Sequence, residues 1–115
     1  MHISDGSGLS RKNLITPRAL AKLLAHMTDH PERDAFRSSL PRGGERNTTL
    51  DYRLNGAVSA KTGSLEFVRA LSGYTERPNG NRVAFVLFAN NYTGPSYQIT
   101  ETIDAVVEAI RSVSA

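Results

Sequence analysis

Residues 58–64 hold the side chains whose types and order could do chemistry. Lys61 can hold a carboxylate by charge, and the Thr62 hydroxyl can hydrogen-bond the same group. Gly63 carries no side chain, which allows another backbone to come close. The next backbone N–H, that of Ser64, can then point at a negative charge that develops on an oxygen. The plain alternative is a turn before a strand with a solvated lysine.

A second stretch, residues 5–13, reads Asp-Gly-Ser-Gly-Leu-Ser-Arg-Lys-Asn. Its glycines and short polar side chains are typical of a loop. Taken by itself, the stretch predicts only a flexible segment before a helix.

Together the two stretches resemble the D-alanyl-D-alanine carboxypeptidases and endopeptidases among the low-molecular-mass penicillin-binding proteins, the peptidase S13 family. Members carry a similar Asp-Gly-Ser-Gly-Leu-Ser-Arg-x-Asn loop, a helix opened by proline, and an Ala-Lys-Thr-Gly-Ser-Leu strand further along. The similarity continues through residues 71–74, the strand at residues 83–85, and residues 90–95 before the last helix. It therefore covers essentially the whole chain.

The resemblance implies an α/β fold, the C-terminal part of the penicillin-binding transpeptidase and β-lactamase-like fold, with antiparallel strands covered by a C-terminal helix. It also implies that Lys61 and Thr62 bind the terminal carboxylate of D-Ala-D-Ala or of a β-lactam. Gly63 would allow close approach, and the Ser64 N–H would supply one oxyanion donor, so that Lys61 and Ser64 belong to the catalytic set. The strand from Ser64 would pair with the substrate peptide by β-addition.

By the same resemblance, Ser7, Ser10 and Arg11 would lie near the side-chain end of the substrate or brace the site. The reaction would be hydrolysis of the terminal D-Ala-D-Ala bond, or of peptide cross-links, in peptidoglycan. It would pass through an acyl-serine and need no metal or cofactor. The family also implies a periplasmic or extracytoplasmic location.

The sequence departs from the family in what it lacks. No serine has a lysine three residues later, and no serine has an asparagine two residues later. The family's Ser-x-x-Lys and Ser-x-Asn motifs are therefore not in these 115 residues, and no acyl-enzyme is expected by the family's route on this chain alone. Because Met1 also stands directly before a loop motif, we expect residues 1–115 to be the C-terminal segment of a larger peptidase domain.

The first elements that must position these residues are helical. Thr16 and Pro17 open a helix as N-cap and first residue, and an apolar stripe follows at helical spacing. Its members are Leu20, Leu23, Leu24 and Met27. A short second helix is expected from Pro31 to about Ser39. Residues 43–57 read as an irregular loop with a turn around Leu50 to Leu54, where relatives often carry a Gly-rich turn followed by Gly-Thr-Leu.

Strands follow this loop. Leu65 to Thr75 and Arg82 to Asn90 read as two strands, and Pro78-Asn79-Gly80-Asn81 predicts the hairpin turn between them. A final helix is expected after Gly94-Pro95, capped by Ser96. Its predicted buried face holds Ile99, Ile103, Val106, Val107, Ile110 and Val113. Two or three strands with one covering helix would leave an exposed edge strand.

Composition excludes several other functions. The chain has no cysteine, which rules out disulfides and thiolate metal sites. No apolar run approaches the ~18 residues of a membrane span, and the first residues do not form a signal peptide. A net charge of +3 is too small and scattered to indicate nucleic acid; Arg11, Lys12, Arg18 and Lys22 are interpreted as a solvated face.

Three alternatives stay open. His26 and His30 have the i, i+4 spacing of a metal-binding helix, but no third ligand of clear spacing accompanies them, so solvated histidines are the preferred interpretation. A non-catalytic module that binds peptidoglycan or a partner through its strand edge is the main rival to the peptidase. A basic nucleic-acid-binding domain is the third hypothesis.

Overall fold

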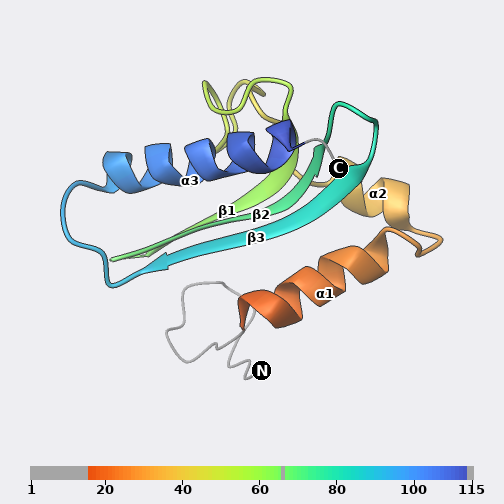
Figure 1. The fold of residues 1–115 in the computed structure, drawn as a ribbon, viewed down its shortest axis with the longest axis horizontal. Coiled ribbons are helices and arrows are strands. Elements are labelled where there is room, and N and C mark those ends of the chain that lie inside the picture. Colours follow the sequence, from red (N-terminus) through yellow and green to blue (C-terminus); the bar gives the residue numbers. More distant parts are fainter. Residues whose placement is uncertain (1–15, 66, 114–115) are drawn as a thin grey trace.

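The computed structural model describes residues 16–65 and 67–113. Its elements are α1 (Pro17–Met27), α2 (Arg33–Ser38), β1 (Val58–Leu65), β2 (Val68–Glu76), β3 (Arg82–Asn90) and α3 (Ser96–Ser112). The strands form one antiparallel sheet in the order β1-β2-β3. Figure 1 shows α3 along one side of the sheet and α1 on the other, so the predicted α/β class with a covering C-terminal helix is confirmed.

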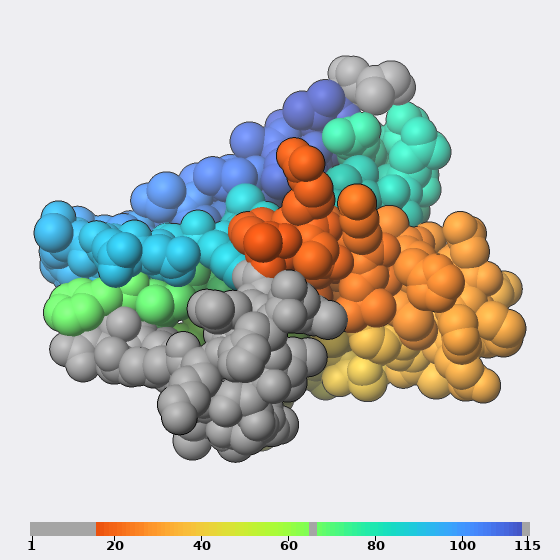
Figure 2. Space-filling view, turned by 90° about the horizontal axis from the view of Figure 1, so that it is seen from below, coloured from red at the N-terminus to blue at the C-terminus, as the bar shows by residue number. Residues whose placement is uncertain are grey.

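Helix α1 begins as its sequence predicts. The Thr16 hydroxyl accepts a hydrogen bond from the Ala19 N–H at 3.1 Å, and Pro17 follows as the first helical residue. Leu24 of the apolar stripe is buried, whereas Leu23 is 49% exposed. The helix packs against β3, and Figure 2 shows α1 and α2 together on this side of the molecule. Helix α2 is two residues shorter at its start than the predicted segment.

The prediction of one strand from Leu65 to Thr75 is wrong, because the chain reverses direction within it. Strand β1 ends at Leu65, which pairs with Val68 at the start of β2. Phe67, in the connection, has φ 59°, a left-handed conformation that bulky side chains rarely adopt. Because no glycine or asparagine signals this turn, the sequence pattern did not reveal it. Lys61, Thr62 and Gly63 consequently lie inside a strand and not before one.

The second hairpin is confirmed. Strands β2 and β3 pair from Val68 with Asn90 to Glu76 with Arg82, and the predicted turn residues connect them. Gly80 has φ 86°, and its N–H donates to the Arg77 carbonyl at 2.8 Å. Glycine adopts this backbone conformation without a steric penalty.

Helix α3 supplies the main core. Ile103 and Val107 are buried in one cluster with Leu71 and Phe85 of the sheet. The expectation of a Ser96 cap is wrong: Pro95 is the N-cap, and no side chain caps the helix. Val106 and Val113 were also expected on the buried face, but they are 39% and 49% exposed. Val113 lies past the last helical residue, as the C-cap with an extended backbone.

The segment between α2 and β1 is irregular, as predicted, but it also contributes to the core. Leu50 is fully buried in the same cluster as Val107. The Arg53 N–H donates to the Leu50 carbonyl at 3.0 Å, which confirms a turn at the predicted place. An irregular segment that buries a leucine completely is held to the sheet by the hydrophobic effect.

Tyr74 of β2 links the sheet to the helices on the other side. Its hydroxyl donates to the Leu24 carbonyl at 2.7 Å, and its ring meets Phe36 edge to face, with 6.4 Å between centroids. Burial raises the pKa of the Tyr74 phenol above its ordinary 10.0, and the positive charge of Arg82 opposes that rise in part.

The free energy of unfolding is therefore expected to fall as the pH rises above about 10, where the unfolded chain ionises Tyr74 while the folded chain still holds it protonated. The stabilisation that protonated Tyr74 gives to the folded chain is fully present below that pH and is lost as the pH rises through the pKa of Tyr74 in the folded chain. Urea unfolding followed by circular dichroism, at about pH 8 and about pH 11, would measure it. Tyr74→Phe should be less stable at the lower pH by about 1 kcal/mol and should show a smaller decrease. Tyr52→Phe, at a side chain 92% exposed, should keep the decrease of the parent chain; equal decreases in all three proteins would contradict the assignment.

Candidate functional site

The backbone of β1 presents hydrogen-bonding groups to its outer edge, the edge that faces away from β2. The Ala60 N–H donates outward to the Pro41 carbonyl at 2.9 Å, and the Val58 carbonyl accepts from the Gly43 N–H at 2.9 Å. In an antiparallel pair, every second residue directs its N–H and C=O to the same side. Thr62 and Ser64 therefore also direct these groups to the outer edge.

This outer edge is open at Thr62 and Ser64 within the described part of the chain. The only bridge to β1 from outside the sheet, among those residues, joins Arg42 to Ser59. Beyond Ala60 the described residues provide no backbone partner for the edge. An unpaired strand edge is a template for an added peptide strand.

Lys61 brings a positive charge to the open edge. Its side chain is exposed, and its Nζ donates to the outward-facing Thr62 carbonyl at 2.5 Å. The ammonium therefore lies beside the place where the Thr62 and Ser64 N–H groups point. A cation next to backbone N–H donors is an arrangement that binds a carboxylate or another oxyanion.

The side chains of Lys61 and Thr62 belong to opposite faces of the sheet, because successive side chains of a strand alternate. Thr62 and Ser64 line a hollow of about 250 Å³ on the side of α3, together with Arg53, Arg69 and Thr100 among others. Lys61 comes from the opposite face and reaches the edge through its long side chain. The expected pairing of its ammonium with the Thr62 hydroxyl on one carboxylate would thus occur around the edge of β1.

Gly63 lies opposite Ala70 of β2. A Cβ atom at Gly63 would come to 3.3 Å from the Ala70 Cβ, a tight contact. Small residues at both positions leave space above this face of the sheet beside Lys61. Glycine at position 63 therefore also serves the packing of the sheet, because a side chain there would crowd Ala70.

Three residues that the sequence analysis did not select surround the end of β1. Arg69 lies directly opposite Ser64, and its guanidinium carbon is 6.0 Å from the centroid of the Tyr92 ring. Phe67, 56% exposed, meets the same ring edge to face at 6.5 Å. The positive φ of Phe67 was not evident from the sequence, so no sequence motif indicated that these side chains lie close together.

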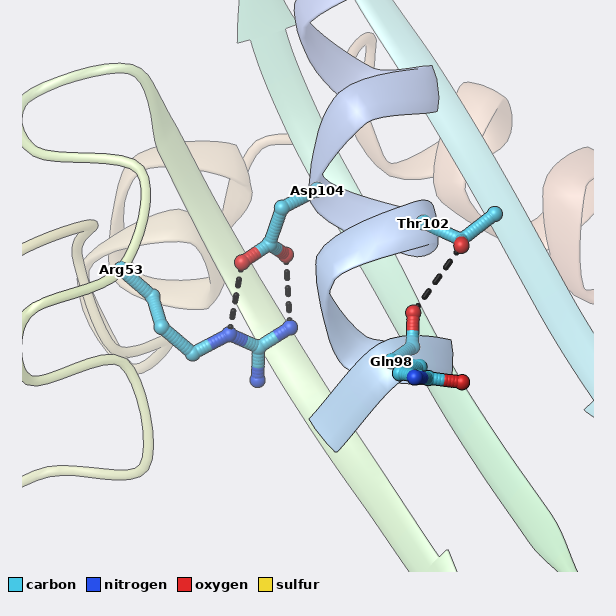
Figure 3. Close-up of polar contacts among 4 residues, drawn as sticks. All are labelled: Arg53, Gln98, Thr102 and Asp104. Atoms are coloured by element: carbon cyan, nitrogen blue, oxygen red, sulfur yellow. Dashed lines mark hydrogen bonds and ion pairs between the residues drawn. The ribbon is translucent and has the colours of Figure 1, made fainter. Parts of the chain in front are cut away.

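An ion pair holds the irregular segment to α3 next to the hollow. The Arg53 Nε and Nη2 donate to the two carboxylate oxygens of Asp104, at 3.0 and 2.7 Å (Figure 3). Each side chain is 22% exposed. A two-pronged, half-buried pair of this kind is both directional and partly shielded from water. The two residues are far apart in sequence, and spacing alone gave no sign of the contact.

The other candidate residues have simpler outcomes. Ser7, Ser10 and Arg11 lie outside the described residues. The rings of His26 and His30 are 6.1 Å apart, and the His30 Nδ1 accepts the Glu32 N–H at 3.0 Å, which leaves that nitrogen engaged. Across residues 16–65 and 67–113, no group of three or more His, Cys, Asp or Glu side chains could hold a metal ion, and no helix is long and apolar enough to cross a bilayer.

Comparison with known proteins first defines the class of fold. The chain superimposes on two solved structures of penicillin-binding protein 4 (dacB) from Haemophilus influenzae, one of them complexed with a β-lactam. The TM-scores are 0.84 and 0.81, at 29% and 27% sequence identity over 95% and 96% of this chain. The match covers 28% and 27% of those chains, so the sheet and helices correspond to a part of the penicillin-binding fold, as the sequence predicted.

The sequence comparisons then give the family. Residues 1–112 match the D-Ala-D-Ala carboxypeptidase 3 (S13) family, and the chain belongs to this family. It is 39% identical over 103 residues to a D-alanyl-D-alanine carboxypeptidase of Actinomadura sp. (strain R39), and 34% identical over 97 residues to the D-alanyl-D-alanine carboxypeptidase DacB of H. influenzae. These alignments cover 82% and 79% of this chain but only 19% and 20% of the relatives.

The ion pair between Arg53 and Asp104 is expected to show a coupling free energy of about 1 kcal/mol in a double-mutant cycle. The cycle consists of Arg53→Ala, Asp104→Ala and the double variant, measured by urea unfolding. The more exposed pair of Arg111 and Glu108, 3.4 Å apart at 42% and 52% exposure, serves as the control and should give a coupling near zero. Equal couplings in the two cycles would show that the Arg53 pair does not anchor the segment.

Proposed function

We propose that this chain supplies the substrate-binding strand of a serine-type D-Ala-D-Ala carboxypeptidase or endopeptidase that acts on peptidoglycan outside the cytoplasm. The open edge of β1 beside Lys61 carries the proposal. A stem peptide ending in D-Ala-D-Ala, or a β-lactam, is the ligand class that membership of the family suggests.

In this proposal the substrate adds to the outer edge of β1 as an extra antiparallel strand. The Thr62 and Ser64 backbone groups pair with the peptide, and the Lys61 ammonium holds its terminal carboxylate. The Ser64 N–H binds the carbonyl oxygen of the scissile bond and stabilises the negative charge that forms there in the transition state. The Thr62 hydroxyl adds a hydrogen bond to the carboxylate.

The acyl-serine of the proposed reaction would form on a residue outside these 115, because no Ser-x-x-Lys motif is present among them. The chain then contributes binding, orientation and one oxyanion donor. Removal of an oxyanion-hole donor typically lowers kcat by about 10²–10³. The Ser64 N–H would contribute to kcat by a factor of this order.

Binding of N-acetyl-D-Ala-D-Ala to the ¹⁵N-labelled chain tests the proposed site. The peptide should shift the Thr62 and Ser64 amide signals, and Lys61→Met should weaken binding about tenfold because a charge-assisted hydrogen bond is lost. Lys22→Met, at an exposed lysine of α1, is the matched control and should bind like the parent chain. Shifts confined to other surfaces, or equal affinities for the two variants, would contradict the proposal.

Exposure to a fluorescent penicillin separates catalysis from binding on this chain. We expect no covalent adduct by gel fluorescence or intact mass, because the family's nucleophilic motif is not in the sequence. Penicillin-binding protein 4 of H. influenzae serves as the positive control. A stable acyl adduct on any serine of this chain would overturn the account of the nucleophile, and a non-covalent complex without an adduct agrees with a binding role.

A further inference from the structure

Strand β3 gives the sheet a second outer edge, on the side opposite to β1. The strand order is β1-β2-β3, so β3 pairs with β2 alone. Among residues 16–65 and 67–113, no backbone group from outside the sheet bonds to residues 82–90. Figure 1 shows β3 as the last strand of the sheet, with α3 and α1 on its two faces. The outer edge of β3 is therefore without a backbone partner in the described part of the chain.

The strand register decides which backbone groups of β3 point to this outer edge. The Asn91 N–H donates to the Phe67 carbonyl at 2.9 Å, so Asn91 directs its N–H toward β2. Because every second residue directs its groups to the same side, the odd-numbered residues of β3 also face β2. The outward-facing Ala60 of β1 gives the same phase through its partners Gly73 and Phe85. The N–H and C=O groups at the outer edge are thus those of Arg82, Ala84, Val86, Phe88 and Asn90.

The sequence of β3 has none of the features that usually protect a strand edge. Residues 83–89 read Val-Ala-Phe-Val-Leu-Phe-Ala, an apolar run without charge, proline or glycine. The strand is 9 residues long, and its pairing with β2 is continuous, so no bulge bends the edge away. Edge strands of natural proteins are commonly short, charged, bulged or covered. An apolar edge of this length is suited to pairing with another strand.

A second copy of the chain offers a strand that fits this edge. Two β3 strands related by a two-fold axis pair antiparallel, and the register that uses their full length places the axis at Val86. Val86 then lies opposite Val86 of the second copy, and Ala84 lies opposite Phe88. Arg82 lies opposite Asn90, so the two arginines are about 27 Å apart, at about 3.4 Å per residue. No like charges meet along the edge.

The same symmetry keeps each face of the sheet continuous. An axis perpendicular to the sheet leaves both copies of α3 on one face and both copies of α1 on the other. Phe85 and Leu87 stay in the core with α3, because only backbone groups of β3 change partners. The outer edge of β1 does not offer an equivalent contact, since residues 41–43 occupy its first part. Association through β3 therefore ends at the dimer instead of continuing into a fibre.

We propose that this chain forms a two-fold symmetric dimer through the outer edge of β3, so that two 3-stranded sheets join into one continuous antiparallel sheet. The partner is a second copy of the same chain. The outer edges of β1 lie at the two ends of the joined sheet and stay accessible. The inference does not depend on the proposed function, because it concerns the opposite edge of the sheet.

Single cysteines test the register, because the chain has no cysteine of its own. Val86→Cys brings two thiols together at the axis, with Cα atoms about 5.5 Å apart, which is within disulfide range. Ala84→Cys is the matched control: it lies opposite Phe88 of the second copy, so its two cysteines are about 14 Å apart and cannot bridge. After mild oxidation, a non-reducing gel should show at least about tenfold more covalent dimer for Val86→Cys. Equal yields from the two variants would contradict the proposed register.

Sedimentation equilibrium of the parent chain, over a wide range of protein concentration, tests the dimer itself. Mass action predicts a rise from the monomer mass to twice that mass. Val86→Pro removes an outward N–H that β2 does not use, so it should weaken the dimer at least about tenfold through two symmetry-related hydrogen bonds. Val106→Lys, at an exposed apolar residue of α3, is the control and should leave the dimer unchanged.

The outcomes of these measurements decide the proposal. A parent chain that stays a monomer at every concentration would overturn it. A dimer that Val106→Lys disrupts and Val86→Pro leaves intact would place the contact on α3 and contradict it as well. Circular dichroism checks that each variant is folded; if Val86→Pro is not, the comparison of the two cysteine variants decides whether β3 forms the contact.

Discussion

The register between β1 and β2 is the constraint on which the rest of the structure depends. Gly73 makes the close approach of the two strands feasible, because a Cβ atom there would lie 2.1 Å from the Ser59 carbonyl oxygen. A slip of one residue would move every side chain of β1 to the other face. Lys61 would then point toward α3, and the N–H groups of Thr62 and Ser64 would turn into the sheet. The position of Lys61 beside the outward-facing N–H groups is therefore a property of the strand pairing and not of the tripeptide.

The main core lies on the side of the sheet that α3 covers. Leu50, Leu71 and Val107 are buried together in the main core, to which α3, the sheet and the segment before β1 all contribute. The Arg53 and Asp104 pair joins α3 and the segment before β1 near the hollow beside Thr62. Strand β1 pairs with β2 on one side, and residues 41–43 occupy the first part of its outer edge. Among the described residues, the part of that edge left open is therefore short.

The sequence predicted the class of fold, the family, the helix α1 with its Thr16 cap, the hairpin at residues 78–81 and the covering helix. The family and the class of fold followed from the resemblance of the joined motifs, whereas the helices and the hairpin rest on local signals: a capping residue, an Asn-Gly turn and an apolar period of about 3.6 residues. It failed at the turn after Leu65, where Phe67 adopts a left-handed backbone without a glycine. It also assigned Val106 and Val113 to the buried face, although both are exposed; for Val113 the reason is that an apolar period does not reveal where the helix ends.

The sequence by itself determined which chemical groups are available: a lysine, a hydroxyl, a glycine and a following N–H. It also determined the family, whose name refers to D-Ala-D-Ala. Only the tertiary structure decided which backbone groups of β1 face outward, that Lys61 and Thr62 approach the edge from opposite faces, and that residues 41–43 close one end of it. The physical reason is that these features arise from hydrogen bonds and packing between segments distant along the chain. Such contacts leave no periodic or local signature in the residues that make them.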